Sequence, residues 1–515
     1  MLTDTEQLQE RKVGERVRLI HIALLICIMA GGTLARVHKL GRTSYWFDEM
    51  GSVLYARGQM TAMYSPPQGY FEHAPAIASE PGNRGWRDIW FSYDTNPPLY
   101  AILLRIWWQF MGDSDVSGRM MSVVLSVAII AVVFDVGRLI ATPRVALWAC
   151  ALCAASPPQV RYAQEARSYA LLGMLGVLSC DIALRVVRYG GGARRYALLG
   201  ILCAAALFTH FFIAGAVASI AIFGMITLRG RPRVAMVCVV GAAFIVGLWE
   251  LPSLWNHTQN LREGLGWLVE PRSGLFLRTL VRVASLPAAY LIQPIDAQGI
   301  AGAPSLAIVV LPLFLNKRRP GLLLTGLWSI GVIGLVAASD LWLSHGALSY
   351  IRYTLAASPM VFVSFATLSD LGGRWTRNLL PGLAVAGALL ALPDVYYDEL
   401  WQKPEARALA QDVRSHIASD DVLVILSAPD MGLYSAGQEY LSLDFYSGPL
   451  PCALAVLEAP ASEAVRHSIW SHRRVWIVQT FYGADAEDYL GPCRLAPVAT
   501  TRSHAGRLFL AQSIK

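Results

Sequence analysis

The sequence predicts a polytopic α-helical membrane protein with a small α/β domain at its C-terminal end. Of the 515 residues, 55% are hydrophobic and only 15% are charged, and the mean hydropathy is +0.44. Soluble domains carry about 25% charged residues, so this composition excludes an ordinary soluble protein. Long apolar runs dominate residues 1–393, whereas residues 394–515 are more polar. We therefore expect a membrane domain over the first range and an extracytoplasmic α/β domain over the second.

About eleven apolar runs are long enough, or nearly so, to cross a bilayer. They are residues 19–36, 117–138, 144–158, 167–187, 195–210, 211–228, 233–251, 303–316, 320–339, 352–370 and 377–393. With a cytoplasmic N-terminus, this count places every basic cluster on the cytoplasmic side, as the positive-inside rule requires. The clusters are Arg11/Lys12/Arg16/Arg18, Arg138/Arg144, Arg185/Arg188/Arg194/Arg195, Arg229/Arg231/Arg233, Lys317/Arg318/Arg319 and Arg374/Arg377. The sequence thus predicts a multi-pass protein of the cytoplasmic (inner) membrane with its C-terminus outside.

Two further apolar segments, Leu99–Met111 and Leu275–Ile292, contain arginines. Threading either one through the bilayer would move the basic clusters that follow it to the wrong side. We therefore expect both to form amphipathic helices in the outer membrane interface.

The polar tail alternates helix and strand patterns. A helix is expected over Pro404–Ile417 and another around Tyr440, with buried strands over Val422–Leu426 and Arg474–Val478. This alternation predicts a small α/β domain. Cys452 and Cys493 both fall in this tail, and their spacing leaves a disulfide and two free thiols equally open.

The net charge of +7 is not a sign of nucleic-acid binding. The arginines occur in short clusters between apolar runs, which is a topology pattern and not a basic stripe. No nucleic-acid partner is expected.

An acidic pair, Asp48-Glu49, follows the first apolar run directly behind two aromatic residues. Carboxylates at a membrane boundary are costly, so the pair indicates chemistry there. Asp48 is the candidate base, and the structural alternative is that it caps a helix beginning near Met50. Glu49 could orient Asp48, bias its protonation through like charge, bind an acceptor, or simply be a surface residue.

A second acidic candidate, Glu165, lies in the segment Gln164-Glu165-Ala166-Arg167-Ser168-Tyr169. A helix beginning near Gln164 would place Glu165 and Tyr169 on one face. Glu165 could then position a substrate or a catalytic arginine. Alternatively, it pairs with a neighbouring arginine and only holds the loop together.

Arg352, Tyr353 and His210 lie at the predicted outer ends of apolar runs. Arg352 could bind a phosphate through two hydrogen bonds, or extend to the lipid headgroups as an anchor. Tyr353 could add a hydrogen bond, and His210 is either a site residue or a structural one. No spacing of His, Asp and Glu resembles a zinc or magnesium site, so no cofactor is expected to be required, although Asp48-Glu49 could hold a divalent cation.

Together these motifs resemble the GT-C glycosyltransferases, in particular bacterial relatives of protein O-mannosyltransferases and of lipid A aminoarabinose transferases. The resemblance covers roughly residues 17–393. The motifs follow the order expected of that group: Phe47-Asp48-Glu49, Asn96-Pro97-Pro98-Leu99-Tyr100, Gln164-Glu165-Ala166-Arg167-Ser168-Tyr169, Thr209-His210 and Arg352-Tyr353. Asn96 departs from the pattern, since many relatives carry His or Lys before the two prolines.

The resemblance implies transfer of a sugar from a polyprenyl-phosphate donor to an acceptor hydroxyl outside the cytoplasmic membrane. Such a donor already carries a phosphate leaving group, so no nucleotide site is needed. It implies that Asp48 is catalytic and that the reaction inverts the sugar's configuration. The acceptor could be a glycolipid, a polysaccharide or a protein. The candidate residues suit this reaction, because the transfer needs a base to deprotonate the hydroxyl and cations to bind the departing phosphate. We assign the phosphate to Arg352, Tyr353 and Arg167, and sugar or acceptor contacts to His210, Tyr169 and Asn96.

Two other functions compete with this interpretation. A transporter or flippase of a lipid-linked sugar would also be polytopic, but internal repeats and helices broken at mid-membrane are typical of transporters. The sequence shows no such repeat. A non-catalytic protein that displays its tail as a binding module would give no reason for the acidic residues to gather on one side.

Overall fold

The structure is a computed structural model that describes residues 17–80, 85–90, 97–250, 268–291, 299–315, 319–397, 406–427, 435–479, 485–499 and 507–514. Contacts divide the chain into two compact units. The helical unit comprises residues 1–40, 117–252 and 268–398, and the mixed unit comprises residues 41–116, 253–267 and 399–515. This grouping differs from the expected division at residue 394, because residues 41–116, called the first loop below, belong with the tail.

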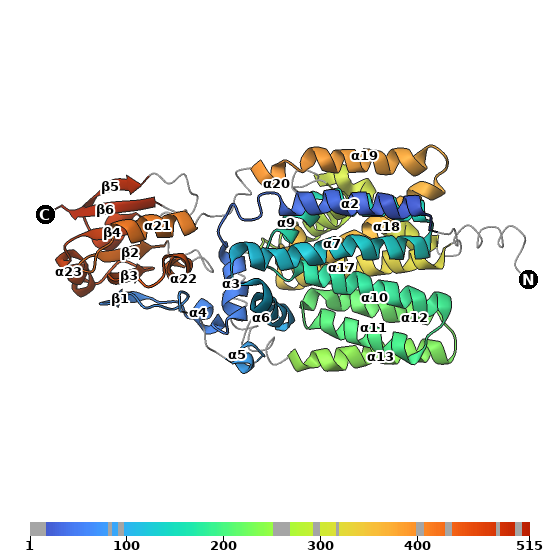
Figure 1. The fold of residues 1–515 in the computed structure, drawn as a ribbon, viewed down its shortest axis with the longest axis horizontal. Coiled ribbons are helices and arrows are strands. Elements are labelled where there is room, and N and C mark those ends of the chain that lie inside the picture. Colours follow the sequence, from blue (N-terminus) through green and yellow to red (C-terminus); the bar gives the residue numbers. More distant parts are fainter. Residues whose placement is uncertain are drawn as a thin grey trace, which may run out of the picture. The chain divides into compact units, whose positions relative to one another are not determined.

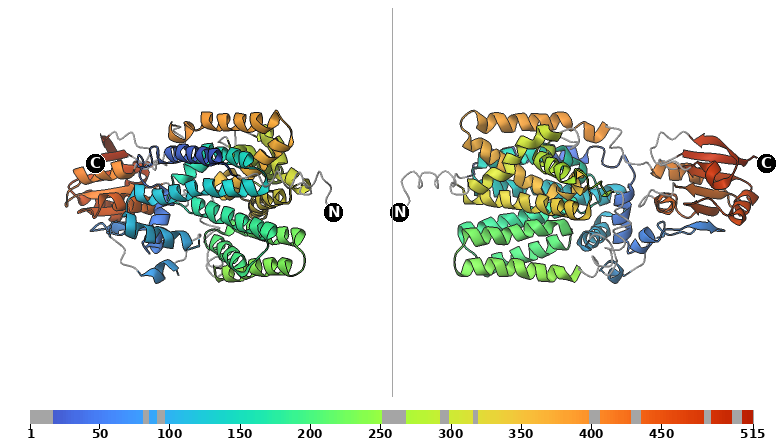
Figure 2. Two further views of the ribbon diagram at one scale, coloured as in Figure 1. Left: turned by 45° about the vertical axis from the view of Figure 1, so that its right-hand side comes forward. Right: turned by 180° about the vertical axis from the view of Figure 1, so that it is seen from behind.

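The helical unit is a bundle of long helices that run alongside one another (Figures 1 and 2). Its α-helices are α2 (Leu19–Val37), α7 (Asp115–Ile140), α8 (Pro143–Ala155), α9 (Pro157–Ala163), α10 (Tyr169–Tyr189), α11 (Ala193–Leu207), α12 (Ala214–Thr227), α13 (Arg231–Gly247), α15 (Leu275–Ala289), α16 (Ala307–Phe314), α17 (Pro320–Leu343), α18 (Ser358–Leu371), α19 (Thr376–Ala391) and α20 (Asp394–Tyr397). Short 3₁₀ turns connect them: η1 (Phe211–Ile213), η2 (Leu248–Glu250), η5 (Gly299–Leu306), η6 (Ala347–Ser349), η7 (Ile351–Tyr353) and η8 (Leu355–Ala357).

Each predicted apolar run coincides, within a few residues, with a helix or a run of consecutive helices. Within the described residues, five helical segments are long and apolar enough to cross a membrane by length and composition. These are Leu19–Val37, Asp115–Ile140, Tyr169–Tyr189, Pro320–Leu343 and Thr376–Tyr397. The count of eleven crossings stays a prediction, as does the interfacial position of α15 and of α6 (Leu99–Met111).

Close packing of two helices explains one pair of glycines in the bundle. A Cβ on Gly215 of α12 would lie 2.1 Å from the carbonyl oxygen of Gly331 on α17, and a Cβ on Gly331 would lie 2.4 Å from the carbonyl oxygen of Gly215. Only glycine allows the two backbones to approach this closely, as small residues do in membrane helix pairs.

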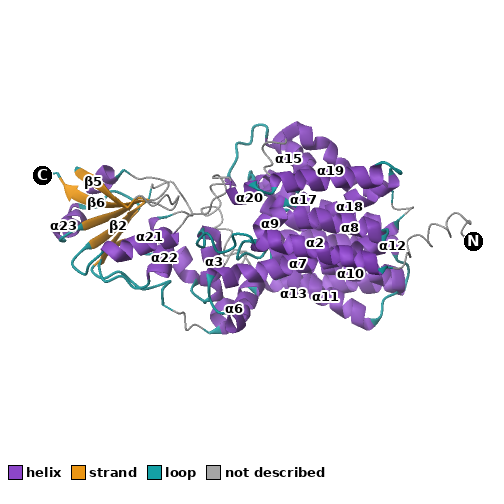
Figure 3. Cartoon of the chain, turned by 45° about the horizontal axis from the view of Figure 1, so that its top comes forward, coloured by secondary structure: helices purple, strands orange, loops and turns teal. Residues whose placement is uncertain are grey.

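The mixed unit is built around a six-stranded sheet in the order β1-β3-β2-β4-β6-β5, drawn in orange in Figure 3. The strands are β1 (Gly69–Phe71), β2 (Val422–Leu426), β3 (Ala453–Leu457), β4 (Val475–Gln479), β5 (Cys493–Ala499) and β6 (Arg507–Ser513). The central strands β3, β2 and β4 are parallel, whereas β1, β6 and β5 pair antiparallel with their neighbours. Every residue of β2 and β3 is buried, as expected for parallel strands covered on both faces.

Helices cover both faces of this sheet. Apolar residues of α21 (Ala406–His416) and α22 (Ala436–Ser447) pack on one face, and those of α23 (Glu463–Ser471) and α24 (Ala486–Leu490) pack on the other. The first loop contributes α3 (Phe47–Ala56), α4 (Met60–Tyr64), α5 (Trp86–Trp90) and α6 to the same unit.

Cys452 and Cys493 do not form a disulfide. Cys452 belongs to the apolar core on one face of the sheet and Cys493 to the core on the other. Cys452 directly precedes β3, and Cys493 is the first residue of β5. These two strands are separated by β2, β4 and β6, so roughly 19 Å of sheet lies between them at about 4.8 Å per strand. A disulfide needs Cα atoms within about 7 Å of each other.

Candidate active site

The acidic pair lies in the first turn of α3. The helix begins at Phe47, so Asp48 is already inside it and the predicted alternative, that Asp48 caps a helix near Met50, is wrong. Glu49 makes the capping contact instead, because its Oε2 accepts a hydrogen bond of 3.4 Å from the backbone N–H of Trp46. Glu49 is fully buried and Asp48 is partly exposed. Both carboxylates lie in the first turn of α3, at the positive end of the helix dipole.

Glu165 lies in a loop, and the helix predicted to begin near Gln164 is wrong. Ser156 and the two prolines after it start a short helix earlier, α9, with Ser156 Oγ accepting from the backbone N–H of Gln159. That helix ends at Ala163. Gln164 Nε2 then donates to the carbonyl oxygens of Arg36 (2.9 Å) and His38 (2.7 Å), which holds the chain out of helical geometry until α10 begins at Tyr169.

The same loop carries Arg167 and leads into Tyr169. Glu165 is fully buried, and Tyr169 is 4% exposed. Tyr169 meets Tyr162 edge to face with ring centres 5.4 Å apart, and the guanidinium carbon of Arg167 lies 5.8 Å from the Tyr169 ring. Tyr169 and Glu165 therefore share a loop junction, not a helix face.

His210 lies between α11 and α12, outside both helices. Its Nδ1 accepts a hydrogen bond of 3.2 Å from the backbone N–H of Phe212. Arg167 and Arg352 lie close enough to the ring for their positive charges to act on it. Because Nδ1 is an acceptor, Nε2 carries the proton and is a hydrogen-bond donor.

Arg352 and Tyr353 form the short turn η7 that precedes α18. The Arg352 Nη2 atom is 3.5 Å from the Tyr353 hydroxyl, and its guanidinium carbon is 5.1 Å from the Tyr353 ring and 5.3 Å from the Tyr350 ring. Phe212 meets Tyr353 edge to face at 5.6 Å and stacks on His210 at 5.3 Å. Aromatic rings thus link the His210 junction to η7.

These contacts bring Arg167, His210, Arg352 and Tyr353 into one group, called the cationic cluster below. Two guanidinium groups, an imidazole N–H and a phenol offer hydrogen-bond donors and positive charge. A phosphate group is the ligand that such a set of donors suits best.

Comparisons with known proteins agree on the fold. Residues 95–255 match the sequence family described as dolichyl-phosphate-mannose-protein mannosyltransferase. The crystal structure of ArnT from Cupriavidus metallidurans bound to undecaprenyl phosphate has 11% identity to this chain, and the match covers 94% of this chain and 97% of that one with a TM-score of 0.51. The apo structure of ArnT gives 12% identity, 95% and 98% coverage, and a TM-score of 0.51.

The chain has the GT-C glycosyltransferase fold. The Archaeoglobus fulgidus oligosaccharyltransferase in complex with Zn and sulfate is also similar, with 14% identity, 89% and 68% coverage, and a TM-score of 0.50. No curated protein sequence gives a significant match. The resemblance seen in the sequence is thus confirmed at the level of the GT-C fold, and the long apolar helices agree with a membrane protein.

Within this GT-C fold, sequence reasoning missed two neighbours of the cationic cluster, Tyr350 and Phe212. Both are aromatic residues two positions from a candidate, Arg352 or His210, and that proximity was the only available indication. Asn96 lies outside the described residues. No group of three or more His, Cys, Asp or Glu side chains suited to a metal ion occurs among the residues that the structure describes.

Proposed function

We propose that this protein transfers a sugar, a hexose or a pentose, from a polyprenyl-phosphate donor to an acceptor hydroxyl at the outer face of the cytoplasmic membrane. The observation that carries the proposal is the cationic cluster. Three separate stretches of the helical unit, the α9–α10 loop, the α11–α12 junction and η7, contribute its members. Two arginines that lie near one another supply the positive charge and the paired hydrogen-bond donors that a phosphate group accepts.

The cluster supplies the donor side of the reaction. In the proposed complex, Arg352 and Arg167 bind the phosphate oxygens, and their charge stabilises the phosphate as it departs with the electron pair of the sugar–oxygen bond. His210 Nε2 and the Tyr353 hydroxyl donate further hydrogen bonds to the phosphate or the sugar. Glu165, buried in the same loop as Arg167, orients that arginine, and Tyr169 lines the sugar position.

Asp48 supplies the acceptor side. It takes the proton of the acceptor hydroxyl as the new bond to the sugar forms, and a single displacement of this kind inverts the configuration. Glu49 fixes the first turn of α3 through the Trp46 N–H and thereby orients Asp48. Asn96 stays a proposed substrate contact, and no metal is required in this scheme.

The proposal also covers the membrane topology, the donor and the acceptor. Eleven crossings, a cytoplasmic N-terminus and an extracytoplasmic tail agree with the match between helices and apolar runs. A lipid-linked donor agrees with the similarity to ArnT, whose structure was obtained with undecaprenyl phosphate bound. The acceptor is a glycolipid, a polysaccharide or a protein.

Binding of undecaprenyl phosphate to the detergent-solubilised protein tests the donor side. Arg352→Ala should weaken binding by about 10- to 100-fold, since a hydrogen bond to a charged group contributes about 1.5–3 kcal/mol. Arg352→Lys should weaken binding less than Arg352→Ala does, because lysine keeps the positive charge but cannot donate two parallel hydrogen bonds. Arg144→Ala, at an exposed position of α8, is the matched control and should bind as wild type does.

Unchanged binding in Arg352→Ala would refute the assignment of the phosphate to the cationic cluster. Binding with no sugar transfer to any supplied acceptor, but with movement of lipid-linked sugar across vesicles, would favour the transporter alternative.

A further inference from the structure

We infer that the tail is a positioning element for Asp48, with Tyr446 as the residue that orients the segment entering α3. The inference rests on the proposed role of Asp48 as the base. Its structural basis lies entirely within the mixed unit, where the first loop and the tail fold together.

The first loop contributes a strand to the sheet of the tail. Gly69, Tyr70 and Phe71 form β1 and pair antiparallel with Val456, Ala455 and Leu454 of β3. Beside this strand, the Tyr70 hydroxyl shares a hydrogen bond of 2.8 Å with His472 Nε2, and Gln68 Nε2 donates to Glu458 Oε2 at 2.8 Å. The sheet therefore includes the loop as an edge strand.

Helix α22 contacts the first loop at several positions along its length. A Cβ on Gly437 would lie 2.5 Å from the carbonyl oxygen of Pro67, so the helix and the loop approach as closely as backbones can. Gln438 Nε2 donates to the carbonyl oxygen of Met63 at 3.1 Å. Two residues further, the Tyr440 hydroxyl donates to the carbonyl oxygen of Pro75 at 2.7 Å.

Asp444, the next residue on this side of α22, binds the backbone of the loop directly. Its Oδ2 accepts hydrogen bonds from the N–H groups of Ile77 (2.8 Å), Ala78 (2.7 Å) and Ser79 (3.1 Å), and its Oδ1 accepts from the Ser79 hydroxyl (2.6 Å). Asp444 is fully buried. A buried carboxylate satisfied by four donors fixes the conformation of this segment.

The last turn of α22 reaches the segment that enters α3. The Tyr446 hydroxyl accepts a hydrogen bond of 2.7 Å from the backbone N–H of Tyr45 and donates one of 2.8 Å to Asp115 Oδ2. Arg407 of α21 pairs with the same Asp115 oxygen. The ring of Tyr45 is 1% exposed and meets Phe445 edge to face at 6.1 Å.

Helix α21 holds the preceding residue. The N–H of Ala406, at the start of α21, donates to the hydroxyl of Ser44 at 2.8 Å, so Ser44 serves the helix as a capping residue from a distant part of the chain. Ser44 and Tyr45 thus have tail partners directly before Trp46 and α3. The first turn of a helix takes its direction from the residues that enter it, and a misplacement of about 1 Å can cost about 100-fold in rate.

Hydrogen–deuterium exchange on the full-length protein in detergent tests this inference without a substrate. Tyr446→Phe removes one hydroxyl, and exchange should become about 5-fold faster in amides 45–48, consistent with the loss of one hydrogen bond. Tyr440→Phe is the matched control on the same helix. It should accelerate exchange around residues 74–80 and leave amides 45–48 as in wild type. Equal exchange of amides 45–48 in wild type and Tyr446→Phe would overturn the inference.

Turnover distinguishes this inference from the proposed function. Tyr446→Phe should lower kcat about 10-fold with an unchanged KM for the lipid-linked donor, whereas Tyr440→Phe should change neither. If exchange changes as expected but kcat does not, Tyr446 does orient the segment that enters α3. The proposed role of Asp48 as the catalytic base would then be refuted. Should Tyr446→Phe not fold, Ser44→Ala removes the partner of the Ala406 N–H and should show the same selective exchange of amides 45–48.

Discussion

Replacing Asp48 with asparagine should lower the rate of sugar transfer by about 10²- to 10⁴-fold, the usual contribution of a general base. Asparagine has nearly the same shape and cannot accept the proton of the acceptor hydroxyl. The fold should survive, because Asp48 is partly exposed and the capping contact of α3 is made by Glu49. The measurement is single-turnover transfer from a lipid-linked sugar by purified protein, with thermal unfolding as the check on folding.

Asp113→Asn is the control for this experiment. Asp113 belongs to the same unit, and its side chain is 36% exposed in an ion pair of 2.6 Å with Arg57. Because the Asp113 side chain reaches water and asparagine keeps a hydrogen-bond acceptor for Arg57, the variant should lose roughly 1 kcal/mol of stability, and transfer should stay within about 2-fold of wild type. Full transfer activity in a folded Asp48→Asn protein would remove the base from the proposed mechanism, while binding of undecaprenyl phosphate would still report on the cationic cluster.

Most helices of the bundle could be predicted from the sequence because a helix in lipid needs a continuous run of apolar residues, which is visible in the sequence alone. An apolar run of sufficient length identifies a helix without knowledge of its neighbours, as with α17, predicted over 320–339 and observed over Pro320–Leu343. The same holds for the fully buried strand β2, which has the predicted bounds Val422–Leu426. The amphipathic helix α6 likewise has the predicted bounds.

The failures share a physical cause, which is interaction between segments far apart in the sequence. Glu165 was placed on a helix because local spacing allowed it, but the carbonyl groups at the end of α2 bind Gln164 and end the helical geometry. The strand β1 has three residues, too few for a period to show, and it exists because β3 provides a partner. Nothing local distinguishes Asp444 or Tyr446 from any other polar residue on an amphipathic helix.

The cationic cluster shows an intermediate case. The sequence indicates Arg352 and His210 separately, as polar residues at the ends of apolar runs, and Arg167 as a neighbour of Glu165 in the segment Gln164–Tyr169. Their mutual proximity follows from helix packing, which brings three distant junctions to the same end of the bundle. Sequence therefore identified the members and could not show that they meet.

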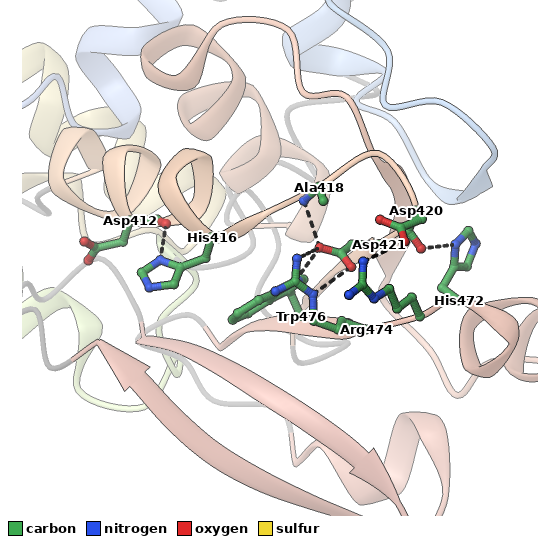
Figure 4. Close-up of polar contacts among 9 residues, drawn as sticks. Asp412, His416, Ala418, Asp420, Asp421, His472, Arg474 and Trp476 are labelled. Atoms are coloured by element: carbon green, nitrogen blue, oxygen red, sulfur yellow. Dashed lines mark hydrogen bonds and ion pairs between the residues drawn. The ribbon is translucent and has the colours of Figure 1, made fainter.

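The largest effect on stability is expected for Asp421→Ala. Asp421 is fully buried at the start of β2 and binds Arg474 through two hydrogen bonds of 3.0 and 2.8 Å, with further bonds from the indole N–H of Trp476 (3.0 Å) and the backbone N–H of Ala418 (2.8 Å) (Figure 4). Asp421→Ala leaves the buried indole N–H of Trp476 without its acceptor, which costs about 1–3 kcal/mol. Because the Arg474 side chain is 37% exposed and can be rehydrated, loss of its ion pair adds little to this cost.

The neighbouring Asp420 provides the matched control. Its side chain is 51% exposed, and its partner Arg473, at 3.3 Å, is 71% exposed. Asp420→Ala should cost less than about 1 kcal/mol. The two variants remove the same carboxylate group from adjacent positions. A difference between their thermal unfolding temperatures therefore reports the effect of burying that group and its hydrogen bonds. Equal unfolding temperatures would show that the Asp421 pair contributes no more than a surface pair.

Asp421→Ala also tests whether the first loop and the tail unfold as one cooperative unit. Asp421 directly precedes β2, an inner strand of the sheet, and is far along the sequence from α3, yet β1 and α22 connect that sheet to the first loop. If the unit unfolds as a whole, Asp421→Ala should lower the temperature at which amides of α3 exchange by the same amount as for amides of β2. Protection of α3 that persists after β2 has unfolded would mean that the helix carrying Asp48 is held by contacts other than those from the tail, and Tyr446 would lose its role as the positioning residue.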